Sequence, residues 1–285
     1  TCYNKNNTNG GLIMIEYSEF TEMLNKRIKL GKDFFLDLLN KVIDDPTRYV
    51  GLFRLSNAKT KLVQNVTQSN EIKFGDFMEE IVTEYIKLQG YSTHEKWLGA
   101  DENGDYLNAD QLFSKNNVIY LVEQKIRDDH DSTKKRGQFL NFKKKVNLLK
   151  SRYPGMEIKG IMWFIDDSKK KNQRYYIQEM NSFRDNNVVL KLYYGQEFFD
   201  SLYRGDEAWE ELVGHLYSYR QSQSNDVINI PDFDTSEEVY LALLEISTTR
   251  WKKLISNSEL YKDLRSELFP TGHNIDKAKR VRGRN

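Results

Sequence analysis

The chain has 285 residues, of which 39% are hydrophobic and 13% aromatic, and this content excludes a wholly disordered protein. Its 43 Lys and Arg residues almost balance its 42 Asp and Glu residues, so the net charge of +1 does not by itself indicate a nucleic-acid partner. The single cysteine, Cys2, excludes an internal disulfide and a cysteine-built zinc site. No apolar run approaches the ~20 residues that span a bilayer, and the first residues are polar, so we expect a soluble cytoplasmic protein without a membrane partner.

The chain is long enough for one sizeable core with additions. We expect three consecutive regions: an N-terminal helical and irregular region over 1–70, a main domain over 71–204, and a C-terminal helical region with a basic end over 205–285.

The first elements are expected to be helical. Residues 15–44 place apolar side chains at helical spacing and stop before Pro46, which predicts one or two helices. The polar stretch 53–72 predicts an irregular surface arm. A helix is then expected from about Asp76 to Gln89, ended by Gly90 as a left-handed cap.

The main domain continues with a mixture of strands and helices. We expect strands at 91–98, in a hairpin within 107–128, and at 158–166, 174–180 and 188–194, with helices at 134–152 and within 195–205. This order predicts a mixed α/β fold, a central sheet flanked by helices. From Asp206 onward the pattern predicts mostly helices, interrupted by a loop at 221–234.

The hairpin LNADQLFSKNNVIYLVEQKIRD carries three charges in its most apolar part. Side chains alternate faces along a strand, so Glu123 and Lys125 share a face. A two-residue turn at Asn116-Asn117 places Asp110 opposite Glu123. A turn one residue earlier also keeps Asp110 on that face, whereas a three-residue loop sends it to the other face. Both even-length turns therefore bring the three charges together.

These three charges suit a particular chemistry. Buried carboxylates repel each other unless a cation lies between them, and oxygen ligands without Cys or His favour Mg²⁺ over zinc. Lys125 could then hold an attacking water or a phosphate oxygen, as phosphodiester hydrolysis requires. The alternative is an ordinary, partly exposed ion pair of Lys125 with Glu123 or Asp110.

Asp110, followed after twelve residues by Glu123-Gln124-Lys125 at the end of an apolar strand, resembles the PD-(D/E)xK nuclease superfamily, and especially type II restriction endonucleases. Ala109 stands where that pattern often has Pro. The resemblance covers 71–204 and implies a restriction-endonuclease-like core. It implies that Asp110 and Glu123 bind Mg²⁺, that the backbone carbonyl of Gln124 is a further metal ligand, and that Lys125 assists the water.

Two flanking segments extend the resemblance. GDFMEEIVTEYIKLQGY, residues 75–91, is similar to the first core helix of that family, which often carries a carboxylate facing the metal. Glu79 matches it, with Glu80 as the substitute if the helix is rotated, and a solvated helix face is the alternative for Glu79. YYGQEFF, residues 193–199, is similar to a strand-to-helix step late in such cores and has a packing role.

Positive charge gathers just after the motif. Residues 125–152 hold ten Lys or Arg and three Asp, a local balance of +7. We expect DNA contacts from the start of the next helix, at Lys134, Lys135, Arg136 and Gln138. A helix-capping or surface role is the alternative for Gln138. Further lysines follow along the helix, although they cannot all share one face, at Lys143, Lys144, Lys145 and Lys150.

Several other polar residues have two interpretations. Asp128, Asp129 and Asp131 are candidate extra metal ligands or members of a polar loop. His130 could contact DNA or simply be exposed. The basic end over 276–285 has a balance of +4 and could lie along a phosphate backbone, although unstructured basic tails are common.

Together these features predict a Mg²⁺-dependent type II restriction endonuclease that cuts double-stranded DNA at a short specific sequence. We expect a homodimer, since symmetric cutting of two strands generally requires two active sites. The alternatives are a repair or junction nuclease with the same fold, and a nucleic-acid-binding module that has lost its chemistry.

Overall fold

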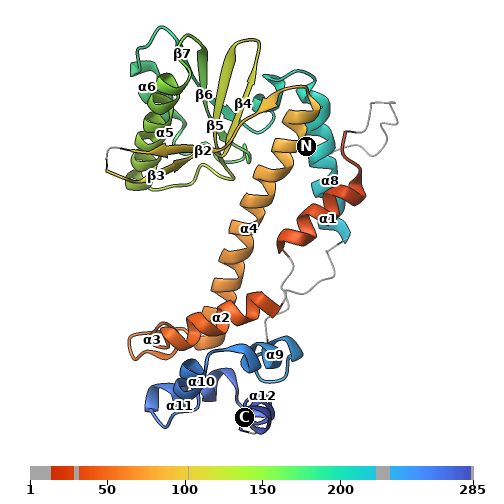
Figure 1. Ribbon diagram of the computed structural model, residues 1–285, viewed down its shortest axis with the longest axis vertical. Helices are drawn as coiled ribbons and strands as arrows, with labels where there is room; N and C mark the ends of the chain where they lie inside the picture. The colour runs from red at the N-terminus through yellow and green to blue at the C-terminus, as the bar shows by residue number, and fades with distance from the viewer. Residues whose placement is uncertain (1–13, 29–31, 102, 223–231, 284–285) are drawn as a thin grey trace. The chain divides into compact units, whose positions relative to one another are not determined.

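The computed structural model describes residues 14–28, 32–101, 103–222 and 232–283 (Figure 1). Its contacts divide the chain into two compact units. The sheet unit contains residues 1–24 and 75–222, and the helical unit contains residues 25–74 and 223–285. The three consecutive regions expected from the sequence stay a prediction. Each compact unit combines segments that lie far apart in the chain.

The N-terminal part is helical, as the spacing of its apolar residues predicted. It forms α1 (Tyr17–Ile28), α2 (Lys32–Asp44), the short α3 (Thr47–Val50) and α4 (Ala58–Leu88). The expected irregular arm at 53–72 is wrong from Ala58 onward, because α4 is one helix of 31 residues. Its first turn is capped by Asn57, whose side chain accepts a hydrogen bond from the Thr60 N–H at 2.8 Å.

The polar composition of early α4 concealed its buried stripe. Leu62 and Val66, one helical turn apart, are buried in the core of the helical unit, while Gln64 between them is exposed. The expected end of this helix is confirmed, since Gly90 follows with a positive φ of 76°.

The sheet unit is built on a five-stranded mixed sheet with the strand order β1-β4-β5-β6-β7. Antiparallel pairing joins β1 to β4 and β4 to β5, and parallel pairing joins β5 to β6 and β6 to β7. A separate two-stranded sheet pairs β2 with β3. The strands are β1 (Ser92–Thr93), β2 (Trp97–Ala100), β3 (Tyr106–Asn108), β4 (Gln111–Lys115), β5 (Val118–Lys125), β6 (Glu157–Phe164) and β7 (Val188–Tyr194). The predicted mixed α/β fold is confirmed.

Helices cover both faces of this sheet (Figure 1). On one face, α5 (Ser132–Arg152) and α6 (Gln173–Ser182) pack on buried residues of β5 and β6. Gly160 of β6 permits this close approach, since a Cβ there would lie 3.0–3.1 Å from side-chain atoms of Phe142 and Val146. The other face carries α4, α7 (Glu197–Asp200) and α8 (Gly205–Ser222), with Trp163 of β6 stacked on Phe198 of α7.

One predicted strand is a helix. Residues 174–180 were expected to be extended, but they lie inside α6. The buried members of this segment are Tyr176 and Met180, four residues apart, which is the spacing of one helical face. Its aromatic content favours strands in general, and packing against α5 decided the outcome, because Tyr176 lies close to the Phe139 ring.

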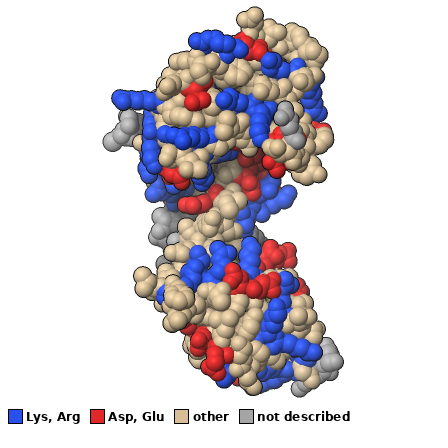
Figure 2. Space-filling model, turned by 90° about the vertical axis from the view of Figure 1, so that its left-hand side faces the viewer, with Lys and Arg blue, Asp and Glu red and all other residues tan. Residues whose placement is uncertain are grey.

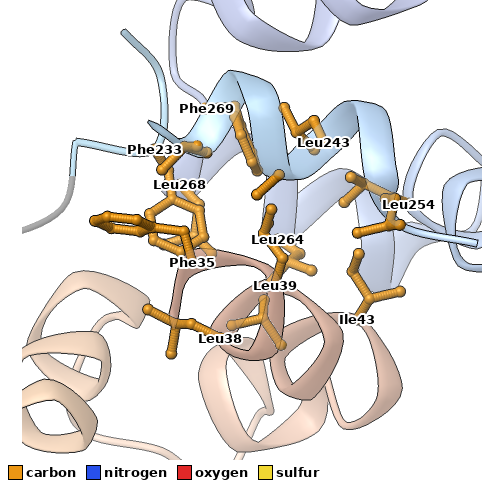
Figure 3. Close-up of a cluster of buried hydrophobic side chains, with 14 of the residues drawn as sticks. Phe35, Leu38, Leu39, Ile43, Phe233, Leu243, Leu254, Leu264, Leu268 and Phe269 are labelled. Atoms are coloured by element: carbon orange, nitrogen blue, oxygen red, sulfur yellow. The ribbon is translucent and has the colours of Figure 1, made fainter. Parts of the chain in front are cut away.

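The helical unit has a core of its own (Figure 3). Its elements are α2, α3, the first part of α4, α9 (Glu237–Glu245), α10 (Thr248–Leu254), α11 (Glu259–Leu268) and α12 (His273–Arg282). Phe35, Leu39 and Ile43 of α2 meet apolar residues of the C-terminal helices. The C-terminal helices expected from the sequence are therefore confirmed.

The basic end of the chain is helical rather than an unstructured tail up to Arg282. The Arg282 guanidinium donates hydrogen bonds to three backbone carbonyls at the end of α9, those of Leu243, Leu244 and Ile246. This arginine closes the open end of a helix, so its charge is used within the protein. Arg284 lies outside the described residues.

Within the described residues, no helix is long and apolar enough to cross a lipid bilayer.

The β4–β5 hairpin has the register predicted for a two-residue turn at Asn116-Asn117. Lys115 pairs with Val118 and Gln111 pairs with Val122, so the turn is Asn116-Asn117. Both turn residues have a positive φ, 51° and 62°, as in a type I′ turn. Asn tolerates this conformation better than most residues, which explains its presence at both positions.

This turn gives a stability prediction. Asn117→Ala should lower the free energy of unfolding by about 1 kcal/mol, because alanine is strained at positive φ. Asn117→Gly should leave it close to the wild-type value, because glycine is not strained there. Urea denaturation of the three proteins measures the difference, and equal losses for both variants would show that the backbone conformation is not the cause.

Candidate active site

Three charged side chains meet at the end of the β4–β5 hairpin. The Lys125 Nζ lies 2.9 Å from Asp110 Oδ2 and 2.9 Å from Glu123 Oε1. It also donates to the backbone carbonyl of Gln124 at 2.9 Å. The alternation of side chains along the strands predicted that these three residues share one face, and the structure brings them together. Their chemical roles stay predictions.

Asp110 precedes β4, and its side chain is held against β5 by a hydrogen bond from the β5 backbone. Its Oδ2 accepts from the Gln124 N–H at 2.7 Å as well as from Lys125. Burial, reinforced by the negative charge of Glu123, raises the pKa of Asp110 above its usual range. The hairpin register and the fixed Asp110 carboxylate together keep two acids within reach of one ammonium group.

Lys145 of α5 is a fourth member of this cluster, which its place among the basic residues of α5 did not predict. Its Nζ lies 2.5 Å from Glu123 Oε2, and its side chain is only 6% exposed. The expectation that Lys145 could face DNA along the helix is therefore wrong. The signal was present in the sequence, because Lys145 lies on the apolar stripe of Phe142, Val146 and Leu149.

The two lysines determine the charge of Glu123. Burial alone would raise the pKa of Glu123, but Lys125 and Lys145 more than offset this effect and hold the pKa below its ordinary value. Burial would likewise lower the pKa of Lys125, yet Glu123 and Asp110 raise it instead. The cluster therefore holds ionised groups of both signs in a site with little access to water.

Glu79 of α4 belongs to the same neighbourhood. Its Oε2 lies 3.5 Å from the Lys96 Nζ, and its carboxylate is partly buried. Burial and the charge of Asp110 raise the pKa of Glu79 to about 7. A hydrogen bond of 2.8 Å from Gln111 Nε2 to the Glu79 carbonyl fixes this turn of α4 beside β4. The neighbouring Glu80, the substitute candidate, is half-buried.

Gln124 presents its side chain and its carbonyl to different surroundings. The buried side chain accepts a hydrogen bond from Gln111 Nε2 at 3.3 Å, on the α4 side of the sheet. The carbonyl oxygen accepts from Lys125. This is the orientation expected if the carbonyl, and not the side chain, serves as a metal ligand.

The donor set can be compared with the requirements of Mg²⁺. In the part of the chain that the structure describes, no three His, Cys, Asp or Glu side chains are arranged to hold a metal. The oxygens of Asp110, Glu123 and the Gln124 carbonyl are nevertheless hard donors at one place. Mg²⁺ is usually bound through one or two carboxylates, with water and phosphate oxygens completing the shell, so this donor chemistry fits.

The nearby loop residues have other tasks. Asp128 is fully buried and accepts hydrogen bonds from the Asn172 N–H, the Asn172 side chain and the Tyr194 hydroxyl. Asp131 caps α5 by accepting from the Lys134 N–H. These contacts explain both residues without a metal. His130 has a buried Nε2 without a hydrogen-bond partner, and burial lowers its pKa.

The four residues predicted to contact DNA lie in the first two turns of α5. Lys134 and Arg136 are exposed, and the Lys135 Nζ lies 4.8 Å from the centre of the Tyr175 ring. Gln138 is half-buried and accepts a hydrogen bond from the Tyr176 hydroxyl at 3.0 Å. Figure 2 shows Lys and Arg side chains distributed over the visible face of the sheet unit.

Lysines farther along α5 are engaged with the protein. Lys144 pairs with Asp101, and Lys150 pairs with Asp185. The Lys143 Nζ lies 5.3 Å from the centre of the Phe139 ring. The beginning of α5 is therefore a better candidate for phosphate contacts than its middle.

A mixed sheet with two carboxylates and a lysine at the end of a central hairpin is typical of nucleases with a restriction-endonuclease-like core. Comparison with known proteins agrees. The family described as "Type II restriction endonuclease, HinfI" matches residues 16–107 and 94–219, and the chain belongs to this family. The type II restriction enzyme HinfI of Haemophilus influenzae is 24% identical in an alignment of 215 residues, covering 58% of this chain and 78% of that enzyme.

Family membership confirms the resemblance to type II restriction endonucleases and implies that the chain is a nuclease. The matched residues extend beyond the expected core of 71–204 in both directions.

The raised pKa of Glu79 predicts how the free energy of unfolding depends on pH. The pKa of Glu79 moves from an ordinary 4.5 to about 7, so the folded protein keeps this proton at a pH where the unfolded chain has released it. Without divalent ions, the contribution of Glu79 to the free energy of unfolding should therefore fall as pH rises through that interval, then level off. Glu79→Gln should not show this decrease.

Urea denaturation in a chelating buffer at several values between about pH 5 and pH 8 checks the prediction. The stability of Glu79→Gln relative to wild type should increase over the interval. Glu84→Gln is the control, because Glu84 is a more exposed α4 carboxylate paired with Lys87. A pH-independent difference between Glu79→Gln and wild type would contradict the prediction.

Proposed function

We propose that this protein is a Mg²⁺-dependent type II restriction endonuclease that cuts double-stranded DNA at a short specific sequence. The observation that carries the proposal is the cluster of Asp110, Glu123 and Lys125 in a chain of the HinfI family. The relative from Haemophilus influenzae is itself named a type II restriction enzyme, which supports the same activity here.

In this proposal, Mg²⁺ would be held by Asp110, Glu123 and the carbonyl of Gln124. A bound Mg²⁺ supplies charge stabilisation at the phosphate and activates water. Lys125 is already anchored between the two carboxylates, so its ammonium group would orient the attacking water or contact a phosphate oxygen. Glu79 would add a further carboxylate that faces the same site.

The arrangement also explains why the charges are tolerated before DNA binds. Each carboxylate of the cluster has an ammonium partner within 2.9 Å. Removing one partner from a buried ion pair is strongly destabilising, whereas a complete set of partners offsets the loss of water. A binding module without chemistry would gain nothing from keeping these charges inside the sheet unit.

DNA contacts are proposed for the start of α5, at Lys134, Lys135, Arg136 and Gln138. Only six residues separate Lys125, the last residue of β5, from Ser132, the first residue of α5. Cations here would neutralise phosphates and make binding salt-dependent. Gln138 is held by Tyr176 and would act through its remaining hydrogen-bonding groups.

A homodimer is part of the proposal, since one active site cuts one strand and symmetric cutting needs two. The family match favours a restriction enzyme over a repair or junction nuclease built on the same core.

Plasmid cleavage tests the proposed function. Plasmid DNA incubated with the protein and Mg²⁺ should give discrete fragments, and a chelator should abolish them. Smearing would indicate a nonspecific nuclease, and retardation without cutting would indicate a binding module. Lys125→Ala should abolish cleavage while keeping DNA affinity within roughly tenfold, about 1.4 kcal/mol.

Lys144→Ala is the matched control, because Lys144 is a lysine of α5 whose partner, Asp101, lies outside the cluster. It should cleave like wild type. Cleavage that survives in Lys125→Ala would remove the proposed role of that residue. Circular dichroism of both variants verifies that the fold is retained.

A further inference from the structure

Both carboxylate oxygens of Glu123 are occupied by lysines from different elements. Oε1 is paired with Lys125 of β5, and Oε2 is paired with Lys145 of α5 at 2.5 Å. The cluster therefore contains two acids, Asp110 and Glu123, and two ammonium groups. The motif that identified the site includes only one lysine, so Lys145 requires a separate explanation.

We propose that Lys145 is a positioning residue that holds Glu123 and weakens divalent-ion binding until DNA is present, so that the ion and DNA bind cooperatively. This inference rests on the proposed function. It assigns Lys145 to the metal-binding step and not to contact with DNA.

The argument begins with charge. With two acids and two lysines, the cluster is balanced, and a divalent ion would add two uncompensated positive charges near both ammonium groups. Lys145 also occupies Glu123 Oε2, so the ion must compete with it for that oxygen. A DNA phosphate brings negative charge to the same place, which favours entry of the ion. Ion binding and DNA binding then strengthen each other by the same factor.

Packing alone does not explain a lysine at this position. Lys145 lies beside Phe142, Val146 and Leu149 on the buried face of α5. An apolar residue of similar length would fill that space without the cost of burying a charge. Lys145→Met removes one of the two lysine partners of Glu123, so the variant should lose stability, but it should still fold because Glu123 stays paired with Lys125.

Calorimetric titration of the full chain with Mn²⁺ alone tests the inference. Without DNA, Lys145→Met should bind Mn²⁺ at least tenfold more tightly than wild type, and added DNA should improve its affinity less than it improves that of wild type. Lys145→Arg keeps the charge and should behave like wild type. Lys144→Met, the adjacent lysine of α5 paired with Asp101, should leave Mn²⁺ affinity unchanged.

Unchanged or weaker Mn²⁺ binding by Lys145→Met would overturn the proposal, because a purely structural lysine would only disturb Glu123 when removed. Lys145→Gln gives a second neutral variant if the Met variant does not fold. If wild-type protein binds DNA but binds no Mn²⁺ even with DNA present, the proposed metal-dependent function fails, and this outcome is distinct from the failure of the role of Lys145.

A separate feature lies in the helical unit, in the loop between α3 and α4. Leu52, Phe53 and Leu55 are 90%, 99% and 109% exposed. The loop is anchored at both ends. The Gly51 N–H donates a hydrogen bond to the Thr47 carbonyl at 3.1 Å, and Asn57 caps α4. Three large apolar side chains are thus presented to solvent by a short, anchored segment, which normally marks a binding surface.

The charges around this loop indicate its partner. Residues 46–70 contain four basic residues, Arg48, Arg54, Lys59 and Lys61, and no Asp or Glu. Arg48 is ion-paired with Asp45 just before this stretch, so the relevant charges are those of Arg54, Lys59 and Lys61. A second copy of the loop would bring like charges together. Three side chains also bury only roughly 500 Å², less than the roughly 800 Å² per partner of a stable protein interface. DNA combines a negative backbone with base steps that accept Leu and Phe as wedges.

From these observations we infer that Leu52, Phe53 and Leu55 insert between base pairs of bound DNA, an inference that also rests on the proposed function. The triple variant Leu52→Ser/Phe53→Ala/Leu55→Ser should bind duplex DNA at least tenfold more weakly in fluorescence anisotropy without Mg²⁺. Its salt dependence should stay that of wild type, because the three side chains carry no charge that could neutralise a phosphate. A 2-aminopurine reporter should brighten with wild type and not with the variant.

Two comparison proteins make this test specific. Lys134→Ala/Arg136→Ala should instead reduce the salt slope, by roughly 1 for each phosphate that the variant no longer neutralises. Val281→Ser, another exposed apolar position of the helical unit, should bind like wild type. Unchanged affinity of the triple variant, or a fall in its molecular mass by light scattering, would overturn the inference, the latter in favour of a contact between copies. Wild-type protein that does not bind DNA would refute the proposed function itself.

Discussion

The register of the β4–β5 hairpin is the constraint on which the rest of the site depends. The turn at Asn116-Asn117 sets this register. The last residue pair of the hairpin is Gln111 with Val122, and just beyond it the Asp110 carboxylate accepts a hydrogen bond from the Gln124 N–H. Because side chains alternate along a strand, a shift of one residue would send Asp110 to the opposite face from Glu123. The geometry of the cluster is thus determined mainly by backbone pairing, and the charged side chains are positioned by it.

The electrostatics of the cluster follow from this geometry. Backbone pairing places two carboxylates close together in a partly dry location, where burial and then the charge of Glu123 raise the pKa of Asp110. Lys125 and Lys145 compensate Glu123 so fully that its pKa is lowered despite burial. Glu79 pairs with Lys96 at the longer distance of 3.5 Å and keeps a raised pKa. The pKa values of neighbouring carboxylates therefore shift in opposite directions, because burial raises those of Asp110 and Glu79, whereas two lysine partners outweigh burial at Glu123.

The parts that the sequence predicted correctly are those determined locally. The alternation of side chains along the strands and a two-residue Asn turn were sufficient to predict that Asp110, Glu123 and Lys125 share one face of the sheet. All three lie within sixteen residues of the chain. Tertiary contacts decided the features that were missed. Packing on distant helices makes early α4 regular, contact with α5 makes residues 174–180 helical, and the buried face of α5 carries Lys145 to Glu123. The two units were also hidden, because each joins segments that are distant in the chain.

Charge counting illustrates the same limit for DNA binding. Ten Lys or Arg residues lie between 125 and 152, but five of them are ion-paired with carboxylates of the sheet unit, namely Lys125, Arg127, Lys144, Lys145 and Lys150. Those charges largely serve the fold and the candidate site, so the local balance of +7 overstates what a phosphate backbone would meet. At the start of α5, by contrast, Lys134 and Arg136 are exposed to solvent. Because ion pairs within the protein use many of these charges, the candidate region for phosphate contacts is the first part of α5, which follows β5 most closely.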